Sequence, residues 1–228
     1  MKLELLRKIA TTSQVYIVDV GHHKGHFIES FSKELALPRE KLYIVGVDAI
    51  NYDTNVCDRF YEGAVTNRDE NFLTFNLYDE PGCNSLLTLK TEKLVRDRNQ
   101  DGWFCNHEIK KIGEKTVPCC PLKVILEDSG WFKGIIHYLK VDAQGNDLDV
   151  IKSLREYLGS CLFIQMESCV SNKLDNTMYE GQNLFDSDRA FMEANGFEVL
   201  TFTDHSQVSC PEADVVFVNK KLFASLSA

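Results

Sequence analysis

The sequence predicts an α/β fold of the doubly wound type, with a mostly parallel sheet and a terminal antiparallel strand. Two observations predict it. Three short apolar runs carry an acid at or near their carboxyl ends, namely Asp19, Asp48 and Asp142, and ligands of open α/β sheets bind at that edge. The last two strand-like runs, 197–203 and 214–218, are joined by a polar loop, which is typical of an antiparallel pair.

The first element is a strand that ends in a glycine turn. Val15–Val20 is apolar except for Asp19, and Gly21 and Gly25 follow with three residues between them. Gly21 allows a sharp turn, and Gly25 lets a ligand or the sheet approach the start of the next helix. The dinucleotide pattern G-x-G-x-x-G is absent, and an acid two residues before the first glycine disfavours a pyrophosphate. S-adenosylmethionine, which carries an ammonium group and a sulfonium, therefore fits this turn better than NAD.

The second strand is expected over 41–47 and ends on Asp48. An acid at this tip suits a bidentate grip on ribose hydroxyls, while the alternative is an aspartate that only faces solvent. Before it, Phe27, Phe31 and Leu35 recur at a spacing of four, which predicts one buried helix face.

The middle of the chain predicts a third strand at 60–65 and another at 71–77, with Gly63 giving room beside a planar ring. Residues 88–117 are charged, carry scattered aromatics and follow no sustained period. We interpret them as an insertion or hairpin that covers a site, or else as a solvated surface loop.

Order returns in the second half, where strands are expected at 135–141 and 161–166. Asp142 and Glu167 follow these strands directly, so both acids belong at the carboxyl edge of the sheet. Helices are expected at 121–129, 146–158 and 184–195.

Composition limits the classes of protein. The 228 residues are 44% hydrophobic with a net charge of -9, which suits one domain (1–228) and disfavours a general nucleic-acid binder. The charged N-terminus and the absence of a long apolar run predict no signal peptide and no membrane span, hence a cytoplasmic protein. Eight cysteines are expected as reduced thiols, because no secretory signal is recognised. Cys105 and His107 could belong to a zinc site, but no C-x-x-C pair and no second pair with ligand spacing accompany them.

Several stretches together resemble the FkbM family of S-adenosylmethionine-dependent methyltransferases. VDVGHHKGHF resembles its first motif, VGVDAI its ribose-binding strand, and LKVDAQGNDLDVI its signature K-I-D-V-E/Q-G-x-E. YEGAVTN, PGCNSLL, FIQMES, MYEGQ and ADVVFVNKKL then match further family segments, so that the resemblance covers 15–220. The chain departs from the family at His22 and His23, which replace Ala-Asn, at Asp147, which replaces Glu, and in the insertion.

The resemblance implies a Rossmann-like class I methyltransferase sheet and methyl transfer to a hydroxyl oxygen, commonly of a sugar or glycan. A non-sugar small molecule is an alternative acceptor, and a non-catalytic binding module that keeps the fold is another alternative. The resemblance also implies a small-molecule or glycan partner, while the net charge and the lack of a long apolar run predict no nucleic-acid and no membrane partner. Carried over by motif, the residues near the cofactor would be Asp19, Gly21, His23, Lys24, Gly25, Asp48, Ala64 and Val65.

A sugar hydroxyl is a weak acid, so the transfer needs a base or a metal ion. Asp142 is the expected base, but it could instead hold a divalent cation with Glu167 or Asp147, or cap the following helix. The clustered histidines after Gly21 could form a metal site or pack locally. For the acceptor, aromatic faces and polar groups suit a sugar, and the candidates are Trp103, His107, Glu167 and Glu180.

Overall fold

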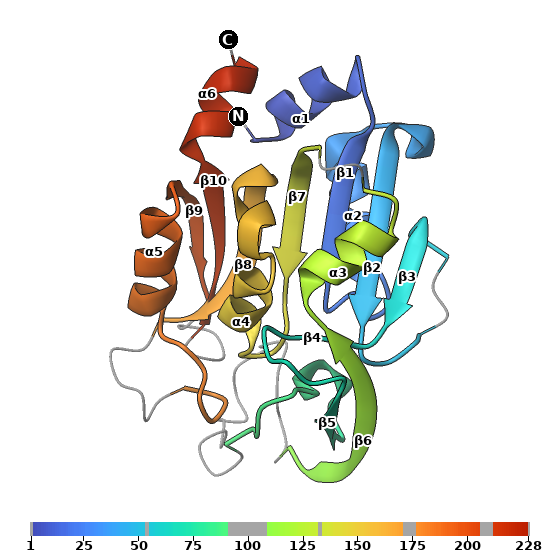
Figure 1. The fold of residues 1–228 in the computed structure, drawn as a ribbon, viewed down its shortest axis with the longest axis vertical. Coiled ribbons are helices and arrows are strands. Elements are labelled where there is room, and N and C mark those ends of the chain that lie inside the picture. Colours follow the sequence, from blue (N-terminus) through green and yellow to red (C-terminus); the bar gives the residue numbers. More distant parts are fainter. Residues whose placement is uncertain are drawn as a thin grey trace, which may run out of the picture.

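The computed structural model describes residues 2–52, 55–90, 109–131, 134–170, 177–205 and 212–227. They form a seven-stranded sheet with helices on both faces and a three-stranded sheet beyond one edge (Figure 1). The predicted α/β class is therefore confirmed. Trp103 and His107, both predicted to contact the acceptor, lie outside the described residues.

The main sheet contains β1 (Val15–Val20), β2 (Leu42–Asp48), β3 (Arg59–Glu62), β7 (Ile136–Val141), β8 (Cys161–Cys169), β9 (Phe197–Asp204) and β10 (Glu212–Asn219). Their order is β3-β2-β1-β7-β8-β10-β9. Strand β1 pairs in parallel with both β2 and β7, and β10 pairs antiparallel with β8 and β9. The strand order thus reverses between β1 and β7, which is where open α/β sheets bind ligands. The prediction of a mostly parallel sheet with a terminal antiparallel strand is confirmed.

Helices cover both faces of this sheet. One face packs against α1 (Lys2–Ala10), α2 (His26–Leu35) and α6 (Lys220–Ser227). The other face packs against α3 (Leu122–Asp128), α4 (Asp147–Lys152) and α5 (Phe185–Ala194). Short 3₁₀ turns lie at η1 (Arg39–Lys41), η2 (Pro81–Cys83) and η4 (Arg155–Ser160). None of the described helices is long and apolar enough to cross a membrane.

The predicted helices agree with this arrangement in most respects. The buried face of α2 contains Phe31 and Leu35, as its spacing predicts. The helix expected at 146–158 divides into α4 and η4, while α1 and α6 were not predicted from the sequence.

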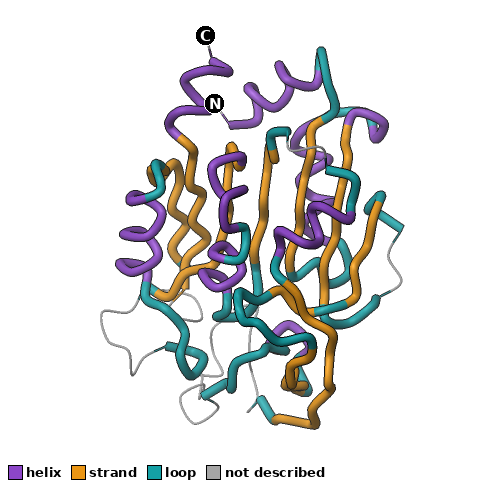
Figure 2. Tube along the Cα trace, viewed as in Figure 1, coloured by secondary structure: helices purple, strands orange, loops and turns teal. Residues whose placement is uncertain are grey.

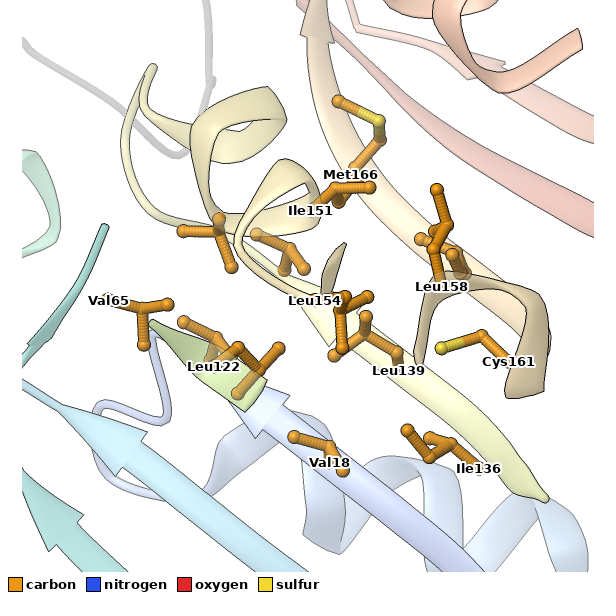
Figure 3. Close-up of a cluster of buried hydrophobic side chains, with 14 of the residues drawn as sticks. Val18, Val65, Leu122, Ile136, Leu139, Ile151, Leu154, Leu158, Cys161 and Met166 are labelled. Carbon is orange, nitrogen blue, oxygen red and sulfur yellow. The ribbon is translucent and has the colours of Figure 1, made fainter. Parts of the chain in front are cut away.

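The larger core lies between the sheet and the helices α3 and α4 (Figure 3). Val18 of β1 and Leu139 of β7 meet Leu122 of α3 and Leu154 there, all with no exposed surface. Because side chains alternate along a strand, Tyr138 points to the opposite face and packs with α2. Burial of each such side chain stabilises the fold by roughly 1.5–3 kcal/mol, so the ends of β1 and β7 are held firmly beside each other.

A smaller sheet lies beyond the carboxyl ends of β1, β2 and β7 (Figure 2). It consists of β4 (Ala64–Val65), β5 (Phe72–Tyr78) and β6 (Lys111–Cys120), in the order β4-β6-β5. The end of the expected insertion therefore belongs to β6, which pairs antiparallel with β5. Residues 91–108 lie outside the described residues.

Two predicted strand boundaries were wrong. The run 60–65 is not one strand, because the chain leaves the main sheet at Gly63 and enters the smaller one. A Cβ atom at Gly63 would lie 2.9 Å from the Pro118 carbonyl oxygen, so the crossing requires glycine. The strand expected at 161–166 continues to Cys169, which places Glu167 within β8 rather than after it.

Candidate functional site

A cavity opens where the carboxyl ends of β1, β2 and β7 meet the smaller sheet. Its empty volume is about 710 Å³, including the part that is open to solvent, which falls in the range of about 300–1,000 Å³ for small-molecule sites. Six of the predicted site residues line this cavity, namely Gly21, His23, Asp48, Ala64, Val65 and Asp142. The fold therefore brings together side chains that lie far apart in the sequence.

The Asp48 carboxylate stands at the end of β2 and accepts two backbone hydrogen bonds. Its Oδ2 accepts from the amide of His23 at 2.7 Å, and its Oδ1 accepts from the amide of Ile50 at 2.9 Å. Burial raises the pKa of Asp48, while these two donors oppose the rise. Each carboxylate oxygen has a second lone pair, so Asp48 can still accept hydrogen bonds from two neighbouring hydroxyl groups.

The side chain of His23 forms part of the same wall. Its backbone adopts a φ of 47°, and its ring stacks on Tyr52 with 4.7 Å between ring centroids. Burial lowers the pKa of His23, which favours the neutral imidazole. Ala64, Phe75 and Leu86 also line the cavity and belong to one apolar cluster, and such a surface suits a planar ring.

Asp19 does not line the cavity but lies beneath it. Its side chain is fully buried, with Oδ2 2.8 Å from His22 Nδ1 and Oδ1 3.4 Å from Lys140 Nζ. Lys140 also donates to the Gly21 carbonyl at 2.9 Å and lies 3.3 Å from Asp142 Oδ2. The cationic side chains of His22 and Lys140 thus lie beside the carboxylates of Asp19 and Asp142, below the turn at Gly21.

The pKa values agree with this arrangement of charges. Burial alone would lower the pKa of His22, but the hydrogen bonds and charges of Asp19 and Cys57 raise it to about 9. Burial likewise opposes the charge of Lys140, and Asp142 and Asp19 outweigh it and raise the pKa of Lys140.

Asp142 lies at the wall of the cavity and remains partly exposed. Its side chain is 37% exposed and lines the cavity. Its Oδ1 accepts a hydrogen bond from Gln144 Nε2 at 2.6 Å. Asp142 is not the cap of α4, because the N-cap position belongs to Asn146. The Asp147 carboxylate instead accepts from the amides of Ala143 and Gly145.

Other predicted residues lie elsewhere. Lys24 is exposed, and Gly25 is buried with a φ of 78° against Val56, so neither lines the cavity. Glu180 is exposed, and its backbone amide donates to the Thr88 carbonyl at 2.9 Å. Glu167 lines a separate small space with Asp147 and Asp188, and burial raises its pKa.

The predicted metal alternatives find no support in the described part of the chain. There, no group of three or more His, Cys, Asp or Glu side chains is placed to hold a metal ion. The His22 ring is engaged by Asp19, and the His23 ring stacks on Tyr52. His22 and His23 therefore make local contacts.

Sequence reasoning missed several residues around the cavity, namely His22 as a partner of Asp19, Lys140, Gln144 and Tyr179. A lysine inside a buried strand is a signal that could have identified Lys140, since buried lysines are almost always paired. Tyr179 gave no such signal, because its position depends on contacts made far along the chain.

The sequence was compared with models of known protein families, and one model matches most of the chain. The model described as "Methyltransferase FkbM domain" matches residues 19–199. A search of curated proteins gave no match.

Two solved structures resemble the chain more weakly. One is the Burkholderia thailandensis 1,6-didemethyltoxoflavin-N1-methyltransferase with bound 1,6-didemethyltoxoflavin and S-adenosylhomocysteine, at 10% identity and a TM-score of 0.39, covering 96% of this chain and 76% of that one. The other is the small RNA methyltransferase HEN1, at 11% identity and a TM-score of 0.36, with 96% of this chain matched but only 25% of that one. TM-scores this low are too weak to support a shared function.

Proposed function

The chain belongs to the FkbM family of S-adenosylmethionine-dependent methyltransferases, and we propose that it methylates a hydroxyl oxygen of a sugar or glycan. The observation that carries this proposal is that Asp48 and Asp142 face one cavity from the ends of β2 and β7. In this proposal Asp48 holds the cofactor and Asp142 acts on the acceptor.

The chemistry of the cavity fits the cofactor. Asp48 offers two carboxylate oxygens for the ribose hydroxyls, and the apolar cluster of Ala64, Phe75 and Leu86 offers a slot for adenine. The neutral form of His23, which burial favours, adds no charge to this wall. When bound, S-adenosylmethionine supplies a methyl group on a positively charged sulfonium.

Asp142 acts on the acceptor in this proposal. A hydroxyl oxygen held in line with the methyl group gains from alignment, which can lower the barrier by about 7–11 kcal/mol. Asp142 accepts the hydroxyl proton, and a positioned base typically adds about 10²–10⁴-fold in rate. Lys140 Nζ lies 3.3 Å from Asp142 Oδ2 and so helps to hold this carboxylate in place.

The acceptor would lie toward the segment that begins near Leu89 and ends near Ile109. Both residues are buried in one small cluster with Tyr78, Met178 and Tyr179. This cluster reaches the cavity lining through the hydrogen bond of Tyr179 to Gln144. We assign acceptor binding to the segment and to its Trp103 and His107. Trp103→Ala should keep cofactor affinity and lose acceptor affinity, and equal loss of both would assign the segment a structural role.

The test is methyl transfer from isotopically labelled S-adenosylmethionine to a panel of glycosides and non-sugar alcohols, detected by mass spectrometry. Asp142→Asn should bind S-adenosylhomocysteine nearly normally in calorimetry and transfer methyl roughly 10²-fold more slowly, as expected for a lost base. Asp149→Asn is the matched control, because Asp149 bonds to Thr66 outside the cavity.

Each alternative predicts a different outcome. Full turnover by cofactor-saturated Asp142→Asn would remove Asp142 from the chemistry. Activity that a chelator abolishes and magnesium restores would favour a metal-ligand role. Cofactor binding without transfer to any acceptor would favour a binding module, and transfer only to the non-sugar alcohols would exclude the sugar.

A further inference from the structure

The orientation of the Asp142 carboxylate is fixed at both of its oxygens. Gln144 Nε2 donates to Oδ1 at 2.6 Å, and Lys140 Nζ lies 3.3 Å from Oδ2. A half-exposed aspartate without such contacts would rotate freely about its side-chain bonds. The side chain of Gln144 therefore lies in direct contact with the proposed base.

The direction of the Gln144 amide is also fixed. Its Oε1 lies 2.8 Å from the hydroxyl of Tyr179, which also lies 3.2 Å from the Cys83 carbonyl oxygen. If the amide were reversed, Oε1 would face the Asp142 carboxylate at the 2.6 Å now spanned by the donor, and two acceptors at that distance repel each other. The Tyr179 hydroxyl as donor and the Asp142 carboxylate as acceptor thus define one orientation of the Gln144 side-chain amide.

The backbone of this turn is held by the same neighbours. Gln144 and Gly145 both have left-handed φ values, of 51° and 88°. Ser85 Oγ donates to the Gln144 carbonyl at 2.7 Å. The ring of Tyr179 lies so close to Gly145 that a Cβ atom there would be 2.9 Å from its Cδ2. Tyr179 therefore supports both the side chain and the backbone of the turn.

Tyr179 connects this turn to the backbone at residues 88–90. The backbone around it pairs with 88–90, since the Glu180 amide donates to Thr88 and the Lys90 amide donates to Met178 at 2.8 Å. Tyr179 itself is fully buried. A contact at residues 88–90 can therefore reach Asp142 through Tyr179 and Gln144.

We propose that Gln144 is a positioning residue for Asp142, and that the Tyr179 hydroxyl fixes it, so that this relay holds the carboxylate ready to accept the acceptor's proton. The proposal rests on the proposed function. It assigns a role in the reaction to two residues, one of which does not line the cavity.

The experiment compares Tyr179→Phe and Gln144→Met with Tyr78→Phe. The Tyr78 hydroxyl lies in the same small cluster but accepts from the Leu89 amide at 2.8 Å instead of contacting Gln144. Tyr179→Phe should lower kcat roughly two- to tenfold, the scale of one hydrogen bond, with an unchanged KM for S-adenosylmethionine. Gln144→Met should lower kcat at least as much, and Tyr78→Phe should affect only thermal stability.

The double variant Gln144→Met/Tyr179→Phe separates a relay from two independent effects. If Tyr179 acts through Gln144, the double variant is no slower than Gln144→Met alone. Additive losses, or equal losses of kcat in Tyr179→Phe and Tyr78→Phe, would overturn the proposal.

A nuclear magnetic resonance measurement tests the same contacts without requiring enzyme activity. The side-chain amide signal of Gln144, assigned by its disappearance in Gln144→Met, should move in Tyr179→Phe and stay in place in Tyr78→Phe. If the Gln144 amide signal did not move in Tyr179→Phe, the proposed contact between Tyr179 and Gln144 would be excluded even in an active enzyme. A signal that responds in a protein without transfer activity would support the relay's geometry and count against the proposed function instead.

Discussion

His22 and Asp19 form a hydrogen-bonded ion pair, with 2.8 Å between Nδ1 and Oδ2 and both side chains fully buried beneath the first glycine turn. His22 stands where the FkbM family usually carries alanine after this glycine. The folded protein holds the proton of His22 more tightly than the unfolded chain does, since its pKa rises from 6.5 to about 9. The pair therefore links the stability of the fold to pH.

We first predict the direction of that link. Because the folded pKa of His22 lies above the unfolded value, the stabilisation is fully present below pH 6.5 and is lost as the pH rises through about 9. The free energy of unfolding, measured with urea, should fall by on the order of 3 kcal/mol over this window from this group. Asp19→Asn should reduce that fall.

The control for this prediction is Asp58→Asn, which breaks the partly exposed pair with Arg39. Arginine keeps its charge throughout the window, so the difference from the wild type should not vary with pH. If the free energy of unfolding of Asp19→Asn also differed from that of the wild type by the same amount at every pH, the prediction would be contradicted.

We next predict that Gly46 is required by the size of His22. A Cβ atom at Gly46 would lie 3.0 Å from Cγ of the His22 ring. Gly46→Ala should therefore destabilise the protein by about 1–3 kcal/mol, the usual cost of overpacking. The cost should shrink in a His22→Ala background, because the ring is gone. Gly113→Ala is the control, since a Cβ atom there meets nothing within 4 Å. Equal costs in both backgrounds would show that His22 is not the obstacle.

The sequence predicted which side chains meet at the carboxyl edge of the sheet better than it predicted the contacts inside the sheet. Asp48 and Asp142 follow apolar runs, and neighbouring parallel strands end at one edge, so their meeting could be inferred. Asp19 precedes the end of its strand by one residue, and it lies beside Lys140 in the β1–β7 register. That register joins residues more than a hundred positions apart, so no local pattern in the sequence indicates that they pair. The same holds for Tyr179, which reaches Gln144 only through tertiary packing.

A third prediction concerns Asp48. Its carboxylate accepts from the amides of His23 and Ile50, so Asp48→Ala removes both the proposed ribose contact and two supports of the cavity wall. We expect the affinity for S-adenosylhomocysteine to fall at least tenfold, about 1.4 kcal/mol, with a modest fall in Tm. Asp58→Ala, which also removes a backbone contact at β2, is the control for the loss of support alone. Unchanged affinity in Asp48→Ala would exclude this placement of the ribose.

The last prediction concerns Asp188, a carboxyl on α5 that is 2% exposed. Its Oδ2 accepts from Ser168 Oγ at 2.6 Å, and among the described residues its Oδ1 has no hydrogen-bond partner. Burial raises the pKa of Asp188 from 3.8 to about 7, although Ser168 and Lys152 oppose the rise. The fold therefore favours the neutral acid, and its stabilisation is present below pH 3.8 and lost as the pH rises through 7.

Asp188→Asn keeps the shape of the side chain and removes the ionisation. Relative to the wild type, the variant should gain stability between pH 4 and pH 8, by on the order of 4 kcal/mol at most. Urea unfolding at several pH values measures this gain, and Asp186→Asn, an exposed position in the first turn of the same helix, should show none. A constant difference between Asp188→Asn and the wild type from pH 4 to pH 8 would mean that Asp188 is already ionised in the fold. Its unpartnered oxygen would then have to be stabilised by solvent that reaches the small space it shares with Asp147 and Glu167.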